Sequence, residues 1–387
     1  MHDAHGTYVC LLTLLPQTNE EAIPMKKGYL LLANGQLYEG ALMGAEKSVM
    51  AELVFTTAMT GYLETLTDPS YEGQIVIQTF PTIGNYGVIP PDFESKAPKL
   101  SGYIAREICD APCNFRSEGR LNDWLIAQGI PCLTGVDTRA LTRTIRNAGV
   151  MNAALLTEKP ADPGALVEQL KALPFHPSIQ DVTCDGVQAP RMEGAYRVVL
   201  WDFGAKENIQ RELEKRGCAV TVVPASATAR DILAMQPDGL MLSNGPGDPA
   251  DNTEVIRNLQ ELMRHGIPTF GICLGHQLLA LSQGAKTVKL KYGHRGANQP
   301  ARDVKTGLSY MTSQNHGFAV DIETLPASAS LRFVNGNDGT CEGIDYTDMP
   351  AFSVQFHPEA CGGPLDTRFL FDRFIAVMGG NKHAVES

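Results

Sequence analysis

The feature that most constrains this chain is a cysteine between two glycines, in Gly271-Ile272-Cys273-Leu274-Gly275. The apolar run at 267–272 predicts a buried strand, and the apolar periodicity of 274–283 predicts a helix. The flanking glycines let strand and helix cross closely, and the helix N-terminus favours a thiolate and can hold an oxyanion. A cysteine at a strand end is more often a small buried hydrophobe, so chemistry here requires a base elsewhere in the chain.

The base that the sequence offers is His357, which follows an apolar strand and precedes Pro358 and Glu359. Glu359 can orient the imidazole and complete a Cys-His-Glu arrangement. By itself this trio also fits a surface histidine before a turn, but a cysteine elbow on the same sheet favours the catalytic interpretation. Among the other histidines, we predict that His276 is structural and that His294 and His316 lie in glycine-bearing loops.

The second half of the chain alternates strands with helices. The pattern predicts strands at 197–202, 220–223, 239–243 and 267–272, and helices at 206–216, 228–235 and 252–265. Such alternation predicts an α/β fold with a doubly wound, mostly parallel sheet that binds ligands at the carboxyl ends of its strands. Cys273 lies at such an end.

The preceding strand ends in a glycine- and proline-rich loop at 243–249. Residues 245–250 spell G-x-G-x-x-A, as in a dinucleotide fingerprint. Its two prolines lack N–H groups that a pyrophosphate would use, and the next strand ends in Cys273 where an acidic ribose ligand is expected. The loop is therefore a tight turn or a wall of backbone donors beside Cys273, and its position favours the wall. Residues 284–287 lack the glycine spacing of a P-loop.

The first half mixes strands and helices without a regular alternation, which predicts a smaller mixed α/β domain. We expect a hairpin around Asn34-Gly35, strands at 52–57, 74–79 and 151–157, helices at 121–128 and 137–147, and a long turn-rich connection at 60–71. The predicted organisation is a non-structural leader or mis-called start at 1–24, an N-terminal domain at 25–172, a linker at 173–193, the second domain at 194–380 and a tail at 381–387.

Charge and cysteine content limit the classes of partner and the compartment that this chain suits. The net charge of −11 and the lack of a Lys/Arg-rich run argue against nucleic acid and anionic membranes. The apolar run at 9–15 is too short to span a bilayer. Nine scattered cysteines suit a reducing cytoplasm better than a disulfide framework. Cys109 and Cys113 form one isolated pair, so we expect no metal site.

Together these motifs resemble a known family. The segments 243–249, 271–277 and 357–359, in this order, are similar to those of the triad-type (class I) glutamine amidotransferases, and the resemblance covers 198–378. In the first half, 60–71, 84–87 and 137–142 resemble the small, glutamine-hydrolysing subunits of carbamoyl phosphate synthetases, from Met25 onward.

The resemblance implies a role for each motif residue. Cys273 would attack the carboxamide of L-glutamine, His357 would act as base and Glu359 would hold His357. The remaining implied contacts are the oxyanion donors Gly247 and Leu274 and the glutamine-binding residues Ser70, Gly245, Gln277, Asn315, Gly317 and Phe318.

The resemblance also implies a partner. This chain would carry no cofactor, and its ammonia would pass to a large subunit that uses ATP and Mg²⁺ to make carbamoyl phosphate for pyrimidine and arginine synthesis. Two alternatives remain open: a stand-alone hydrolase or amidotransferase subunit of another synthetase, which 61–71 argues against, and a silent docking subunit, which the intact Cys273, His357 and Glu359 argue against.

Overall fold

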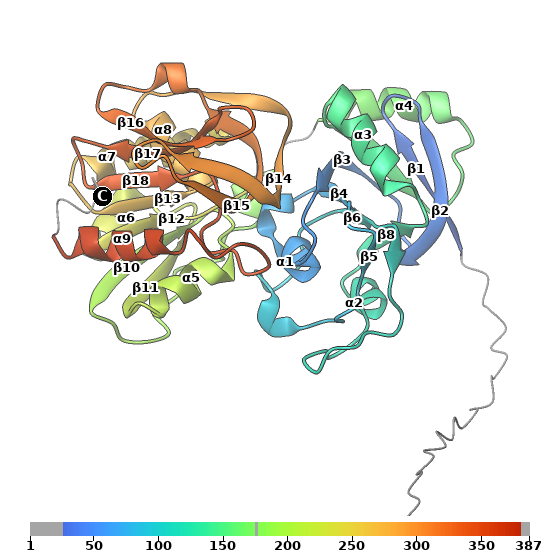
Figure 1. The fold of residues 1–387 in the computed structure, drawn as a ribbon, viewed down its shortest axis with the longest axis horizontal. Coiled ribbons are helices and arrows are strands. Elements are labelled where there is room, and N and C mark those ends of the chain that lie inside the picture. Colours follow the sequence, from blue (N-terminus) through green and yellow to red (C-terminus); the bar gives the residue numbers. More distant parts are fainter. Residues whose placement is uncertain (1–25, 175–176, 381–387) are drawn as a thin grey trace, which may run out of the picture.

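The computed structural model describes residues 26–174 and 177–380, so the predicted leader and tail lie outside the described residues. Figure 1 shows two domains side by side, the first drawn in blue to green and the second in yellow-green to red. Strands β14 (Thr287–Asp303) and β15 (Ser309–Val320) of the second domain lie against the first. Their contact places the functional site between the domains.

The first domain is built on a closed barrel with the strand order β1-β2-β8-β6-β4-β3-β9. Its strands are β1 Lys27–Leu32, β2 Leu37–Gly44, β3 Val49–Thr56, β4 Gln74–Gln78, β6 Gly102–Ile104, β8 Pro131–Thr134 and β9 Met151–Leu156, with the short pair β5 Thr82–Ile83 and β7 Glu107–Ile108 outside it. Its helices are α1 Tyr62–Thr67, α2 Leu121–Ala127, α3 Thr138–Ala148 and α4 Pro163–Ala172.

Local signals explain the elements of this domain that the sequence predicts. The hairpin β1–β2 is confirmed, with Gly35 at φ 88° in its turn. Helix α3 begins after Asp137, whose side chain accepts a hydrogen bond from the Ala140 N–H at 2.9 Å. The connection expected at 60–71 holds α1 and a 3₁₀ turn at Pro69–Tyr71. Strands β6 and β8 were not predicted, because strands of three or four residues give no readable alternation. Helix α4 and the closure of the barrel were not predicted either.

The second domain is a nine-stranded sheet in the order β11-β10-β12-β13-β18-β17-β16-β14-β15. Its remaining strands are β10 Tyr196–Asp202, β11 Cys218–Pro224, β12 Gly239–Leu242, β13 Thr269–Ile272, β16 Ala329–Asn335, β17 Cys341–Tyr346 and β18 Ala351–Val354. The first five strands in this order are parallel, as predicted, and the other four extend the sheet with antiparallel pairs that the sequence analysis did not predict.

Helices cover both faces of this sheet, which confirms the doubly wound prediction. They are α5 Glu207–Glu214, α6 Ala229–Ala234, α7 Thr253–Met263, α8 Leu274–Ser282 and α9 Phe369–Met378. Side chains of α6, α7 and α8 pack with Val199 and Trp201 of β10, whereas those of α5 and α9 pack with Val198 and Leu200. The alternation along β10 thus separates two apolar cores.

One sequence prediction in this domain is wrong. His294 and His316 do not lie in loops; they face each other on the paired strands β14 and β15, with ring centroids 5.0 Å apart. Glycines at 293, 296 and 317 suggested loops, but Gly293 and Gly296 lie within β14, where the pairing with β15 is irregular. Glycine in a strand often marks such an irregularity rather than the end of the strand.

The turn between β13 and α8 has the predicted elbow shape. Cys273 has φ 53° and ψ −104°, a conformation that L side chains rarely adopt. The glycines around it permit close packing: a Cβ on Gly275 would lie 2.4 Å from the Leu242 carbonyl oxygen, and one on Gly271 would lie 2.8 Å from that of Gly275. The backbone contact is possible only without side chains at these positions.

We therefore expect Gly275→Val to lower the free energy of unfolding by about 1–3 kcal/mol or more, because the added carbons overlap rigid backbone. The matched control is Gly186→Val, where a Cβ meets nothing within 4 Å. Urea unfolding followed by circular dichroism measures both. Equal stability of the two variants would contradict the tight crossing at the elbow.

Candidate active site

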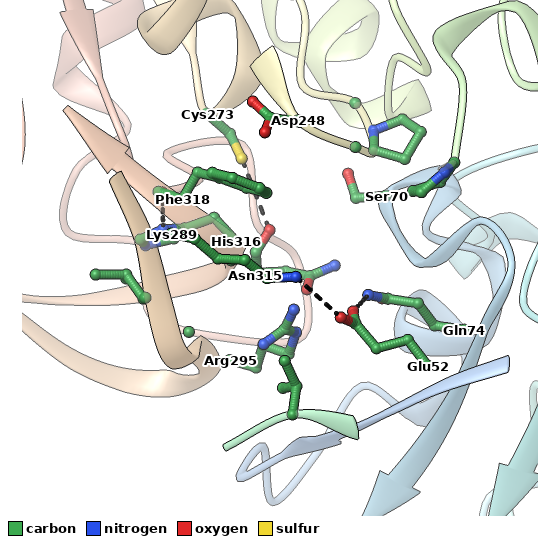
Figure 2. Close-up of a pocket in the computed structure, with 18 of the residues that line it drawn as sticks. Glu52, Ser70, Gln74, Asp248, Cys273, Lys289, Arg295, Asn315, His316 and Phe318 are labelled. Atoms are coloured by element: carbon green, nitrogen blue, oxygen red, sulfur yellow. Dashed lines mark hydrogen bonds and ion pairs between the residues drawn. The ribbon is translucent and has the colours of Figure 1, made fainter. Parts of the chain in front are cut away.

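Cys273 lies at the wall of a cavity of about 250 Å³ between the two domains (Figure 2). Its side chain is 2% exposed, and its Sγ lies 3.7 Å from the Asn315 carbonyl oxygen. The cavity brings together most of the predicted site residues: Ser70, Gly245, Gly247, Cys273, Gln277, Asn315, Gly317 and Phe318. Three predicted residues do not line it: the pair of His357 and Glu359, and Leu274. The Leu274 side chain is buried in the core, so only its backbone N–H, at the first position of α8, suits the predicted role.

His357 and Glu359 form a buried pair after β18, with 2.7 Å between Nδ1 and Oε1. Because Nδ1 is engaged by Glu359, Nε2 is the nitrogen left for the thiol. Burial and the charge of Lys206 lower the pKa of His357, but the charge of Glu359 and hydrogen bonds with Cys273 and Glu359 raise it more, to about 10. The site therefore stabilises an imidazolium, the form that can donate a proton.

Lys206 is a site residue that the sequence analysis missed. Its buried Nζ lies 3.3 Å from Asp68 Oδ2 and 3.8 Å from Glu359 Oε1. Burial lowers the pKa of this amine, but Asp68, Glu359 and Glu94 raise it more, so it remains a cation. Lys206 follows β10 at the sheet edge that carries Cys273. Its position after a predicted strand was the signal that could have identified it.

Asp68 connects the first domain to residues of the second domain around the site. Its Oδ2 accepts a hydrogen bond from Asn315 Nδ2 at 3.0 Å, and its Oδ1 accepts one from the Ser70 N–H at 2.9 Å. Burial raises the pKa of Asp68, but Lys206, His357 and Asn315 lower it more, so this carboxylate is charged. Asp68 was part of the segment quoted for the resemblance, yet no role was predicted for it.

Ser70 reaches the cavity from the first domain, as the resemblance implied. Its Oγ accepts a hydrogen bond from Asn244 Nδ2 at 2.9 Å. Asn244 belongs to the loop after β12, which also places Gly245 and Gly247 at the cavity. Gly247 has φ 90°, and a Cβ there would lie 2.4 Å from the Pro177 carbonyl oxygen. The loop thus lies beside Cys273, although its role as an oxyanion wall stays a prediction.

The cavity wall that contains Phe318 is fixed by two hydrogen bonds to the Phe318 carbonyl oxygen. Gln277 Nε2 donates to the Phe318 carbonyl oxygen at 2.7 Å, and His316 Nδ1 lies 2.7 Å from the same oxygen. Burial, above all, lowers the pKa of His316 well below its ordinary value, so a neutral ring donates this bond.

His276, predicted to be structural, is buried with Nδ1 2.8 Å from Ser353 Oγ.

One group in the described part of the chain has the composition of a metal site: His294, His316 and Glu342. Its ring nitrogens already have protein partners, because His294 Nε2 lies 2.9 Å from Asp338 Oδ2 and His316 Nε2 lies 3.0 Å from Gln314 Oε1. This cluster works as a hydrogen-bond network behind β15. Metal binding there would require breaking these bonds.

Comparisons with known proteins agree with this geometry. Residues 199–377 match the family "Glutamine amidotransferase class-I", and residues 30–155 match "Carbamoyl-phosphate synthase small chain, CPSase domain". Relatives named carbamoyl phosphate synthase small chain include those of Symbiobacterium thermophilum, at 48% identity over 90% of this chain and 97% of that protein, and Staphylococcus epidermidis, at 49% identity over 92% and 96%. A relative of that name from Bacillus thuringiensis is 50% identical over 91% of this chain and 96% of its own length.

The fold and the site of the second domain define a class I glutamine amidotransferase. With a first domain of matching type in front of it, the chain belongs to the carbamoyl phosphate synthase small chain family. Among residues 26–174 and 177–380, no helix is long and apolar enough to cross a membrane.

The raised pKa of His357 gives a prediction. Glu359→Gln removes the anion that favours the imidazolium, so the pKa of His357 should fall and the ring should lose its proton at lower pH than in the wild type. A titration of the ring by nuclear magnetic resonance measures this shift. The control Glu254→Gln, on an exposed face of α7, should leave the titration unchanged. A His357 pKa that Glu359→Gln does not lower would contradict the assigned pair.

A second prediction concerns Lys206. Lys206→Met leaves Asp68 and Glu359 buried without their cation, which should cost about 3–5 kcal/mol of unfolding free energy. Lys26→Met breaks an exposed pair with Glu46 and should cost about 1 kcal/mol or less. Denaturant unfolding of both variants measures the difference. Similar losses would show that the buried network contributes little.

Proposed function

We propose that this chain is the glutamine-hydrolysing subunit of a carbamoyl phosphate synthase. The observation that carries the proposal is Cys273 at a strand-to-helix elbow, at a cavity between the domains, next to the buried pair of His357 and Glu359. The family of the whole chain supports the choice of synthase.

The proposed reaction begins when Cys273 transfers its thiol proton to His357 Nε2 and its Sγ bonds to the carboxamide carbon of L-glutamine. The negative charge on oxygen meets the N–H groups of Gly247 and Leu274, and one such donor is typically worth about 2.7–4 kcal/mol. The C–N bond then breaks, and His357 Nε2 donates a proton so that the nitrogen leaves as ammonia. Water, deprotonated by His357, attacks the thioester carbon, which releases glutamate and returns the thiol.

The partner in this proposal is a large subunit that binds ATP and Mg²⁺ and consumes the ammonia to make carbamoyl phosphate. Two further cavities support a route away from the glutamine cavity. One of about 50 Å³ is lined by Asp68, Lys206 and Gly362, and an open one of about 510 Å³ shares Gly362 and Glu64 with it and reaches Met59. A closed route matters because excluding water keeps ammonia neutral and nucleophilic.

The compartment and the pathway belong to the proposal as well. The eight cysteines in the described part of the chain are all free thiols, which suits the cytoplasm. The product of the assembled synthase would supply pyrimidine and arginine synthesis.

The first test removes the thiol. Cys273→Ser should keep the fold but lower glutamine hydrolysis by at least a thousandfold, because a hydroxyl is far less acidic than a thiol. The control is Cys113→Ser, an exposed thiol away from the cavity, which should retain the wild-type rate. A coupled assay for glutamate measures both, and comparable rates would exclude Cys273 as nucleophile.

The second test separates the two sites of the proposed complex. With Cys273→Ala in complex with the large subunit, synthesis of carbamoyl phosphate from glutamine should vanish, while synthesis from added ammonium salt should persist. Loss of both reactions from an intact complex would contradict two separate sites. Glutamine-dependent synthesis by this chain alone would remove the need for a partner.

A further inference from the structure

Helix α5 of the second domain begins without a capping side chain of its own. Its N-cap residue is Lys206, whose side chain makes no cap hydrogen bond. The first N–H groups of a helix have no partner within the helix, so their acceptors must come from elsewhere. Here they come from Glu94 of the first domain: its carbonyl oxygen accepts from the Glu207 N–H at 2.9 Å, and its Oε2 accepts from the Asn208 N–H at 3.2 Å. One domain therefore caps a helix of the other.

Glu94 is buried and fixed from both sides. It is 2% exposed, and its Oε1 accepts a further hydrogen bond from Asn208 Nδ2 at 2.9 Å. Its backbone N–H donates to Thr67 Oγ1 at 2.9 Å, and Thr67 directly precedes Asp68. Burial raises the pKa of Glu94 to about 7, although the charge of Lys206 opposes this rise. At pH 8 the side chain is therefore mostly an anion, which suits a helix N-terminus.

The start of α5 determines where Lys206 lies. The backbone N–H of Lys206 donates to Asn244 Oδ1 at 3.0 Å, and the residues after it are held by Glu94. From this turn the Nζ group reaches Asp68 Oδ2 at 3.3 Å and Glu359 Oε1 at 3.8 Å. Three carboxylates, those of Asp68, Glu359 and Glu94, thus surround one buried amine. The Glu94 cap lies on the backbone side of this amine.

The place of Lys206 matters for the ring of His357. Glu359 raises the pKa of His357, whereas the charge of Lys206, close to the same carboxylate, lowers it. A ring that keeps its proton too firmly is a poor base for the water that must resolve a thioester. Charge interactions in a buried site weaken as distance grows, so a Lys206 that moved away would leave the imidazolium too stable.

We propose that Glu94 is a positioning residue for the catalytic pair: by capping α5 across the domain boundary, it holds Lys206 near Glu359 and so keeps His357 able to give up its proton. The inference rests on the proposed function for the reaction, and on the contacts above for the geometry. It makes the docking of the first domain on α5 a condition for an efficient base in the second.

The first measurement is glutamine hydrolysis by Glu94→Gln at pH 8. The substitution removes the charge and places an amide group where Asn208 needs acceptors, so kcat should fall about tenfold or more. KM should stay within about threefold, because Glu94 does not line the glutamine cavity. The matched control is Asp162→Asn, the same change of a carboxylate at the exposed N-terminus of α4, where it accepts from the Ala165 N–H. This control should keep the wild-type kcat.

The second measurement separates positioning from simple loss of charge. In Cys273→Ala, where the thiol no longer raises the pKa of His357, nuclear magnetic resonance follows the titration of the ring. Adding Glu94→Gln should raise this pKa, because Lys206 moves away, whereas loss of a nearby anion alone would lower it. In Cys273→Ala/Lys206→Met, the same substitution should not raise it, because the amine through which Glu94 acts is gone.

Two results would overturn the inference: a His357 pKa that Glu94→Gln leaves unchanged or lowers, or an equal rise with and without Lys206. If the Lys206→Met variant does not fold, Glu94→Asp decides, because it keeps the charge but withdraws the carboxylate from α5 by one methylene group. Its kcat should fall as in Glu94→Gln, and a wild-type kcat would contradict the positioning role. A wild-type chain that does not hydrolyse glutamine would contradict the proposed function, while the ring titration would still decide the role of Glu94.

Discussion

The backbone turn at Cys273 is the constraint on which the rest of the site depends. A non-glycine residue at φ 53° and ψ −104° is strained, and such strain costs on the order of 1–3 kcal/mol. The conformation persists because β13 is enclosed by parallel strands, and because Gly271 and Gly275 let the helix start directly against the neighbouring backbone. The same turn presents the thiol at the beginning of α8, where unpaired N–H groups favour negative charge.

A buried network of charges joins this turn to the first domain. Lys206 lies between Asp68 of the first domain and Glu359 of the second, and Asp68 also binds Asn315 at the cavity. Any movement of one domain relative to the other would change the surroundings of the ring of His357, whose pKa depends on Glu359 and Lys206. The first domain thus contributes side chains to the surroundings of the cavity that holds Cys273.

Sequence reasoning predicted the elements whose signal is local. The elbow, the parallel strands and the Cys273, His357 and Glu359 positions follow from glycine spacing, apolar runs and a short motif. Lys206 was missed although its position after a predicted strand was a usable signal, and Asp68 was missed because its role depends on a contact with Lys206 that only the folded chain creates. The antiparallel half of the sheet and the barrel were missed for a similar reason: their short or irregular strands are defined by their partners, and glycines in β14 resembled loop signals.

We expect the fold to activate one thiol, that of Cys273, among the cysteines of this chain. The most direct measurement of this activation is labelling with a chloroketone that carries the glutamine side chain, followed by peptide mass spectrometry. Exposed thiols at Cys113 and Cys361 serve as internal controls, because access alone would favour them over the buried Cys273. We expect one label, on Cys273, that excess glutamine prevents. Labelling of the exposed cysteines with Cys273 unmodified would contradict it.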